Sequence, residues 1–225
     1  MLKSKPQLHL HLRDLEIEQV DETKLLGVTL DSHLTWSSHI DNITKKMGGG
    51  LSMIRRCAEF LTPTSVVQVI QALVISHLDY CPVVWSNAAK RDLHKLQIAQ
   101  NKAARLALKC NIRSNIRLIH QNLSWLLVEQ RLTASLAVFF RNICLNKKPK
   151  CLYKNIHYTS NRHQYNTRHV AKGRFTALKP RTNAMKNTVM YRAMTFWNSL
   201  PVCITSINSK RHFKNRLKHF LIHPD

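Results

Sequence analysis

Residues 62–80 read TPTSVVQVIQALVISHLDY and carry an almost continuous apolar helix pattern. Thr62 followed by Pro63 is typical of a helix N-cap with proline at the first helical position. Apolar side chains then recur on most sides of the helix, so we expect this segment to be the central buried helix. Pro82 ends it, because a residue that precedes proline avoids the α-helical region.

An amphipathic helix is predicted immediately before this segment, over residues 37–61. Its apolar side chains fall on an arc of roughly 80° at about 100° per residue. Thr35, Ser37 or Ser38 is expected to cap its start. The run Gly48–Gly50 is expected to kink it, because each glycine costs about 1 kcal/mol relative to alanine in a helix. The apolar positions are Ile40, Ile43, Met47, Leu51, Ile54, Ala58 and Leu61.

A second amphipathic helix is predicted over residues 88–110, and one of its faces is strongly cationic. Leu93, Leu96 and three alanines share the apolar arc, and the basic residues lie opposite. Solvated helix faces usually mix charges of both signs at i,i+4, but Asp92 is the single acidic residue near this face. An unmixed cationic face favours neutralisation of phosphates, and a plain solvated surface is the alternative. The candidate nucleic-acid-binding residues are Arg91, Lys95, Lys102, Arg105 and Lys109.

The ends of the chain have different patterns. Alternating apolar residues predict strands at Leu8–Leu12 and Leu15–Ile17, and the apolar run Lys24–Leu30 predicts a third strand, so residues 1–36 are expected to form a small antiparallel β-meander. A further helix is expected from Ser124, its cap, to about Asn146. Residues 147–186 are basic and polar, so we expect irregular, poorly ordered chain there. A short basic helix is expected from Ser209 to Leu221.

The net charge narrows the classes of function. The 225 residues carry a formal charge of +23, and the first 60 residues contribute none of it. From Leu61 onward, 27 basic residues face four acidic ones. A chain of this kind requires a polyanionic partner, most often nucleic acid and less often an anionic membrane surface.

Motifs for chemistry are scarce. No stretch of 18 apolar residues and no apolar signal region is present, so we expect no transmembrane segment and a nuclear or cytoplasmic, not secreted, protein with free thiols. Asp31 is interpreted as a turn residue before the first helix.

The sequence contains no glycine-rich loop of the kind that binds phosphate. The series Cys144, Cys151, His157, His163, His169 lacks the spacing of zinc sites, so no metal ligand and no catalytic residue is predicted.

Several motifs, in order along nearly the whole chain, resemble the C-terminal part of reverse transcriptases from LINE-type (non-LTR) retrotransposons, including jockey-like elements. The series is Lys24–Val28 with Asp31, Leu34–Trp36 and His39-Ile40; His77–Cys81 with Val84-Trp85; Leu96-Gln97 with Gln100, Ala103 and Arg105; Leu123 and Trp125-Leu126 with Glu129–Arg131; Tyr165–Arg168; Phe196–Pro201; and Ser209 with Phe213-Lys214 and Leu217-Lys218. Cys81 stands where glycine is usual in that family.

The resemblance implies a mainly helical protein in three parts. Residues 1–36 resemble the end of the polymerase palm, residues 37–146 a helical thumb-like domain, and residues 147–225 a basic post-polymerase tail with a short C-terminal helix. Leu26 and Gly27 are similar to the palm–thumb junction near the primer end.

The family enzyme is an RNA-directed DNA polymerase that uses Mg²⁺ through aspartates of its fingers and palm. No residue of this chain matches those aspartates, so we expect a catalytically incomplete fragment that needs no cofactor and is inactive alone. The implied partners are an RNA or DNA template–primer duplex and the missing palm and fingers of the same polyprotein.

Two other functions remain open from the sequence. The basic amphipathic helix near the C-terminus is compatible with a protein- or membrane-interaction module that docks through Phe213 and Phe220. The chain is also compatible with a decayed element product that has no selected function.

Overall fold

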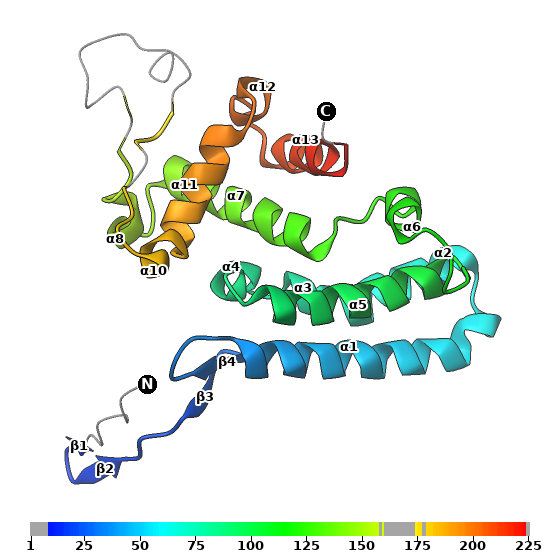
Figure 1. The fold of residues 1–225 in the computed structure, drawn as a ribbon, viewed down its shortest axis with the longest axis horizontal. Coiled ribbons are helices and arrows are strands. Elements are labelled where there is room, and N and C mark those ends of the chain that lie inside the picture. Colours follow the sequence, from blue (N-terminus) through cyan, green and yellow to red (C-terminus); the bar gives the residue numbers. More distant parts are fainter. Residues whose placement is uncertain (1–8, 158, 160–173, 177–178, 224–225) are drawn as a thin grey trace.

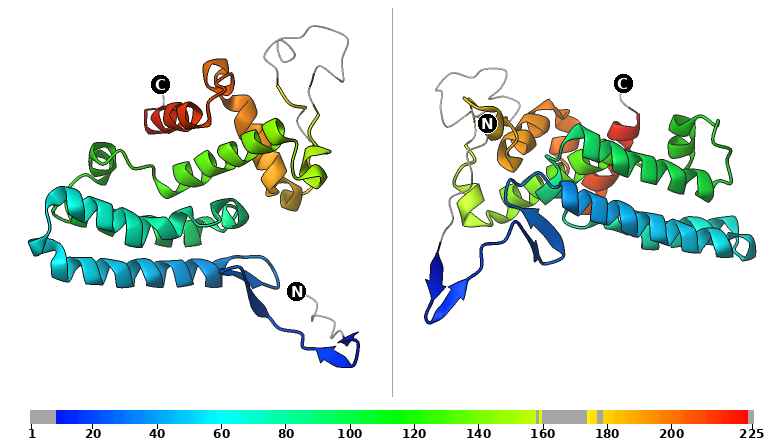
Figure 2. Two further views of the ribbon diagram at one scale, coloured as in Figure 1. Left: turned by 180° about the vertical axis from the view of Figure 1, so that it is seen from behind. Right: turned by 60° about the horizontal axis from the view of Figure 1, so that its bottom comes forward.

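The computed structural model describes residues 9–157, 159, 174–176 and 179–223. The described chain is mainly helical and begins with two small antiparallel hairpins (Figure 1), which confirms the predicted fold class. Helix α1 lies along one side, α5 and then α7 follow, and α13 lies on the far side; a second view shows the same order (Figure 2). No helix among the described residues is long and apolar enough to cross a membrane.

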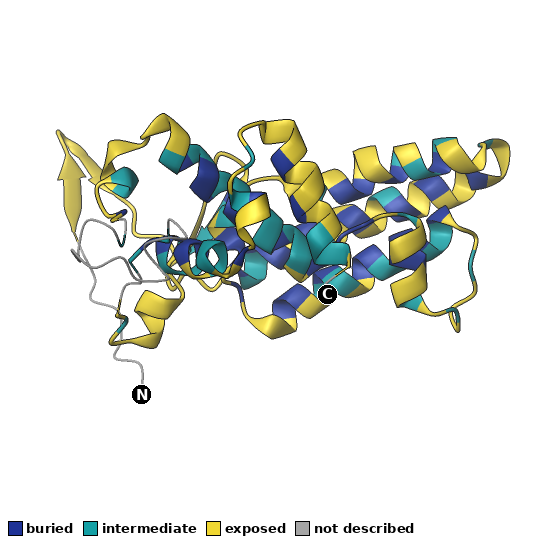
Figure 3. Cartoon of the chain, turned by 90° about the horizontal axis from the view of Figure 1, so that it is seen from above, coloured by how far each residue is buried: buried dark blue, intermediate teal, exposed yellow. Residues whose placement is uncertain are grey.

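The N-terminal strands form two separate hairpins, not one meander. β1 (Leu10–Leu12) pairs with β2 (Leu15–Ile17), and β3 (Glu22–Leu25) pairs with β4 (Val28–Asp31). The predicted single strand over Lys24–Leu30 is wrong, because Leu26 and Gly27 both take positive φ values, 46° and 83°, and reverse the chain. The predicted half-burial of the first two strands is also wrong: β1 and β2 are exposed throughout (Figure 3).

The second hairpin is joined to the start of helix α1 (Ser37–Cys57). Val28 is buried in the main core, and the backbone N–H of Thr29 donates to Nδ1 of His39 at 3.3 Å. Thr35, Ser37 and Ser38 do not cap the helix: its N-cap is Trp36, without a side-chain cap. The carboxylate of Asp31 accepts instead from the N–H groups of Thr35 and Trp36, at 2.9 Å each.

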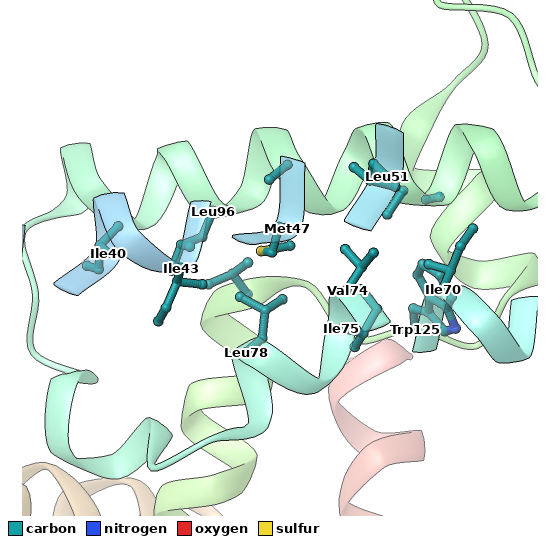
Figure 4. Packing of buried hydrophobic residues seen from close by; sticks show 14 of the residues in the cluster. Ile40, Ile43, Met47, Leu51, Ile70, Val74, Ile75, Leu78, Leu96 and Trp125 are labelled. Atoms are coloured by element: carbon teal, nitrogen blue, oxygen red, sulfur yellow. The ribbon is translucent and has the colours of Figure 1, made fainter. Parts of the chain in front are cut away.

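The main core lies among α1, the helical segment expected from residues 62–80, and α5 (Lys90–Ala107) (Figure 4). That central segment consists of α2 (Pro63–Ile70), a π-helical turn (Gln71–Ile75) and α3 (Ser76–Asp79). The Thr62 hydroxyl accepts from the N–H of Ser65, so the predicted cap is confirmed. Fully or almost fully buried side chains from all three helices meet here: Ile40, Ile43, Met47, Leu51, Ile70, Val74, Ile75, Leu78 and Leu96.

The expected kink at Gly48–Gly50 is wrong, because α1 is continuous from Ser37 to Cys57. A Cβ atom built on Gly50 would lie 3.1 Å from the carbonyl oxygen of Leu73 and 3.2 Å from Cγ2 of Val74. Nothing lies within 4 Å of a Cβ built on Gly48 or Gly49. Gly50 therefore permits close packing of α1 on the π-helical turn, and the other two glycines are open to solvent.

Helix α7 (Val128–Asn146) organises the second half of the molecule. It starts later than predicted, since Ser124 lies in a left-handed turn with φ 50° and the Gln130 side chain accepts from the N–H of Leu127. The short α4 (Pro82–Trp85), α11 (Val189–Ser199) and α13 (Lys210–Ile222) all pack on α7. The remaining elements are the 3₁₀ turn Ala58–Phe60, α6 (Ile116–Asn122), α8 (Lys150–Tyr153), α10 (Asn183–Lys186) and α12 (Val202–Thr205).

Parts of the basic region are ordered into short helices. The expectation of irregular chain over residues 147–186 is wrong for α8 and α10, while residues 158, 160–173 and 177–178 lie outside the described part. The predicted C-terminal helix is confirmed: the Ser209 hydroxyl accepts from the N–H of His212, and Phe213 and Leu217 are buried.

The three glycines of α1 provide a matched stability test. Gly49→Ala should stabilise the protein by about 0.5–1 kcal/mol, because alanine loses less backbone entropy in a helix and meets no neighbour. Gly50→Ala should not increase the free energy of unfolding and should lower it if the packing cannot adjust, because the new methyl group presses on the Leu73 carbonyl. Urea unfolding followed by circular dichroism measures both, and equal stabilisation by the two substitutions would contradict this packing.

Candidate nucleic-acid interface

Part of the predicted cationic face of helix α5 is exposed, because the opposite face of the helix is buried. Leu96, Ala103 and Ala104 are fully buried against the main core, whereas Arg91 and Lys102 are exposed. The Arg91 side chain keeps 79% of its surface accessible. The amphipathic pattern thus predicted the orientation of this helix correctly.

Arg91 lies near one carboxylate, because its Nε is 3.7 Å from Oδ1 of Asp92, whereas Lys95 lies near two. The Nζ atom of Lys95 lies 2.7 Å from Oδ1 of Asp41 on α1 and 3.0 Å from Oδ1 of Asp92. These contacts, that of Asp41 first, raise the pKa of Lys95. Asp41 is 54 positions away, so the local sequence contained no sign of this partner. Lys95 therefore joins α1 to α5, and its charge is compensated.

Asp92 is the buried end of this ion-pair network. Its side chain is completely inaccessible, and Oδ2 accepts a 2.8 Å hydrogen bond from the Ser37 hydroxyl at the start of α1. Burial on its own raises the pKa of Asp92, but the bonds from Ser37 and Lys95 outweigh it and lower the pKa below its usual value. Asp92 therefore stays ionised at neutral pH and fixes the first turn of α5 against α1.

The last two predicted residues lie at the end of α5. The Arg105 side chain is half-buried, and its Nε is buried without a hydrogen-bond partner among the described residues. Lys109 lies beyond the helix, which ends at Ala107 and not at residue 110, and it takes a left-handed conformation with φ 52°. Lys109 is exposed. The structure therefore leaves Arg91, Lys102 and Lys109 exposed on α5 and its C-terminal turn, whereas Arg105 is half-buried.

Leu26 and Gly27 form the tip of the second hairpin. Leu26 is 83% exposed, and its carbonyl oxygen accepts a hydrogen bond from the hydroxyl of Tyr80, which follows α3. A Cβ on Gly27 would lie 3.4 Å from the Tyr80 ring. Two motifs far apart in the sequence thus meet at this tip, which remains accessible beside the end of the central helix.

Other pairs of the family motifs also meet through specific contacts. The Gln100 amide donates to the carbonyl of Leu126 at 2.8 Å, and the guanidinium of Arg131 lies 2.6 Å from the carboxylate of Asp79. The Trp85 side chain is fully buried. Among the described residues, these contacts join α5 and α3 to α7 and to the turn before it.

Candidate metal ligands do not gather in the described part of the chain. No group of three or more histidine, cysteine, aspartate or glutamate residues there is arranged to hold a metal ion. Asp31 lies in the turn before α1, as predicted. Burial raises the pKa of its carboxylate, but hydrogen bonds from the N–H groups of Thr35, Trp36 and His33 outweigh this effect and lower the pKa. Burial raises the pKa of the Cys144 thiol to about 12, and His163 and His169 lie outside the described residues.

Comparisons with known proteins point to transposon polymerases. The chain is 23% identical over 128 residues to "Probable RNA-directed DNA polymerase from transposon BS" of Drosophila melanogaster, covering 55% of this chain and 14% of that protein. It is 23% identical over 112 residues to "Probable RNA-directed DNA polymerase from transposon X-element" of the same species, covering 48% of this chain and 12% of that protein.

These similarities define a reverse-transcriptase-related region in about half of the chain, and the chain spans only about one-seventh of the length of these relatives. No family model matches the sequence, and no solved structure matches it.

The buried carboxylate of Asp92 generates a pH-dependent stability test. Asp92→Asn should destabilise the protein at pH 7 by about 1–3 kcal/mol, because a buried charged partner of Ser37 and Lys95 is lost. The folded pKa is lowered, so this stabilisation is complete above the unfolded pKa of about 3.9 and disappears as the pH falls through the folded value. The free energies of unfolding of the wild-type protein and the Asp92→Asn variant, measured by urea unfolding at a series of pH values, should therefore converge below about pH 4.

Asp41→Asn is the matched control, since it removes the exposed carboxylate that also contacts Lys95. Exposed ion pairs contribute about 0–1 kcal/mol, so this variant should stay close to the wild-type stability at every pH. An equal loss in both variants would mean that burial of Asp92 has no special role.

Proposed function

We propose that this chain is a fragment of a non-LTR retrotransposon reverse transcriptase, comprising the end of the palm, the thumb and the tail, and that it binds template–primer nucleic acid without sequence preference. The single observation that carries the proposal is the exposed cationic side of α5 on a chain with a region related to RNA-directed DNA polymerases. Phosphates are the uniform anionic feature of a duplex, and contacts to them position a protein without reading sequence.

Four residues of α5 and its C-terminal turn would make the phosphate contacts in this proposal. Arg91, Lys102 and Lys109 are exposed, with Arg91 Nε 3.7 Å from Oδ1 of Asp92, and Arg105 is half-buried. Lys95 should contribute less, because Asp41 and Asp92 already compensate its charge. A free ammonium or guanidinium group gains more from releasing the counterions of a phosphate than one that must first leave a carboxylate.

Leu26 and Gly27 are proposed to lie near the primer end. The support is their position at an exposed hairpin tip that Tyr80 holds against the helical body. An RNA or DNA primer strand and the palm and fingers of the same polyprotein would be the neighbours of this tip.

The alternative of an interaction module using the C-terminal helix is not favoured by the fold. That function needs Phe213 and Phe220 free for a partner, but Phe213 and Leu217 are buried against α7 and Phe220 is partly buried. A membrane or protein partner would have to detach α13 first.

The salt dependence of binding tests the α5 surface. Replacing Arg91, Lys102 and Lys109 together by glutamine should reduce the slope of log affinity against log salt by about 0.7–0.9 for each phosphate that is no longer neutralised. Arg105 is kept because its side chain is half-buried. Fluorescence anisotropy with an RNA–DNA hybrid duplex across a salt series gives the slope.

A triple variant of α1 is the matched control for this experiment. Lys45, Lys46 and Arg56 are exposed as well, and their replacement by glutamine removes the same charge from another helix. An unchanged slope in the α5 variant, or the same change in both variants, would reduce the α5 surface to an ordinary solvated face.

Catalytic incompleteness has its own test. The purified chain should not extend a labelled primer on an RNA template in the presence of Mg²⁺ and deoxynucleotides, because none of its residues matches the aspartates that bind the ions in the family. Extension above that of a heat-inactivated sample, measured on a sequencing gel, would contradict this part of the proposal.

A further inference from the structure

A second cationic surface lies on α13, far from α5 in the sequence. Lys210, Lys214 and Lys218 follow one another at i,i+4, and the helix contains no acidic residue. Like charges at this spacing destabilise a helix. No carboxylate of the described residues forms an ion pair with these three lysines, so their charges are available to an external anion.

The orientation of α13 is set by its buried face. Phe213 and Leu217 are fully covered, and the guanidinium of Arg141 on α7 lies 5.1 Å from the centre of the Phe213 ring. Arg141 also donates a 3.0 Å hydrogen bond to the carbonyl of Ile207, just before the helix. Because the helix is held in this way, Lys214 and Lys218 lie along a groove between α13 and α7.

The groove combines positive charge with an apolar lining. It has a volume of about 420 Å³ and includes Phe139 and Val138 of α7, with Val83 of α4. A cavity of about 320 Å³ adjoins it and shares Asp79, Leu126, Arg131 and Lys218 with it. Together they form an extended depression in the size range of ligand sites.

The charge of the groove is unbalanced. Asp79 is the one acidic side chain among the described residues that line it, and Arg131 pairs with Asp79 at 2.6 Å. Lys214 and Lys218 are therefore left without compensation. A ligand that matches this groove offers anionic groups to Lys214 and Lys218 and apolar groups to the apolar lining.

We propose that this groove binds a single strand of nucleic acid, with phosphates at Lys214 and Lys218 and an unpaired base against Phe139. A cationic track with an aromatic side chain beside it is the general means of binding single strands. A duplex keeps its base faces stacked inside and offers the groove only phosphates. The proposal rests on the proposed nucleic-acid function but assigns a different strand to a different surface.

The test compares two double variants of the same helix. Lys214→Gln with Lys218→Gln removes the groove lysines, and Arg211→Gln with Arg216→Gln removes two exposed charges of α13 that do not line the groove. With a labelled oligouridylate of about 12 nucleotides, the first variant should bind about tenfold more weakly. The second should change affinity by less than about threefold, and circular dichroism checks that both remain folded.

Phe139 gives an independent arm. Phe139→Leu should weaken single-strand binding by about fivefold or more, whereas Phe139→Tyr keeps the ring and should keep the affinity. Equal loss in the two lysine and arginine variants, or no loss in Phe139→Leu, would overturn the groove assignment. A competition experiment distinguishes an acidic protein segment. If oligoglutamate displaces the labelled oligouridylate at a lower concentration than unlabelled oligouridylate does, the groove binds an acidic segment and the proposal is overturned.

The two surfaces fail in distinguishable ways. Duplex affinity should stay within about twofold in the groove variant, because the duplex is assigned to α5. If the α5 triple variant keeps its duplex binding while the groove variant loses single-strand binding, the function proposed for α5 fails and the groove stands. Undiminished single-strand binding by the groove variant refutes the groove alone.

Discussion

Close packing of small residues along α5 is the constraint on which the rest of the structure depends. Ala103, Ala104 and Ala107 are buried, and side chains of this size allow neighbouring helices to approach closely. Two glutamines on the same helix then fix the connection to α7: Gln97 accepts from the N–H of Val128, and Gln100 donates to the carbonyl of Leu126, each at 2.8 Å. With one side of α5 packed in this way, Arg91 and Lys102 lie on the solvent side, while Lys95 pairs with Asp41 of α1 and Arg105 is half-buried.

The C-terminal helices belong to the folded body and not to a loose appendage. Phe140 of α7 lies in a T-shaped contact with Phe175, with ring centres 5.0 Å apart, and Trp197 of α11 stacks on Phe213 of α13 at 5.7 Å. Such aromatic contacts add specific geometry to the burial of apolar area. Helices α11 and α13 therefore pack on α7, and α12 packs on α13. Helix α4 also packs on α7 and connects it to the main core.

Periodicity predicted the helices well and their ends less well. The 3.6-residue repeat located α1, α5 and α13, because each buries one face, and an apolar pattern on most sides located the central segment. Turns depended on single residues that a repeat does not register: positive φ values at Leu26 and Gly27 divided an apolar run into a hairpin, and Ser124 proved to be a turn and not a cap. Ion pairs between residues distant in the sequence could not be predicted either, because no local pattern connects Lys95 with Asp41. The pairing of Lys95 with Asp41 could therefore be learned only from the packing of α1 on α5.

The first hairpin has a consequence for how the molecule behaves in solution. Leu10 is paired with Ile17 and Leu12 with Leu15, which places four aliphatic side chains, all 47–74% exposed, on one face of a two-stranded ribbon. Isolated two-stranded ribbons are marginal, and open strand edges recruit further strands. These four side chains therefore form a small exposed apolar surface through which copies of the chain can associate at high concentration.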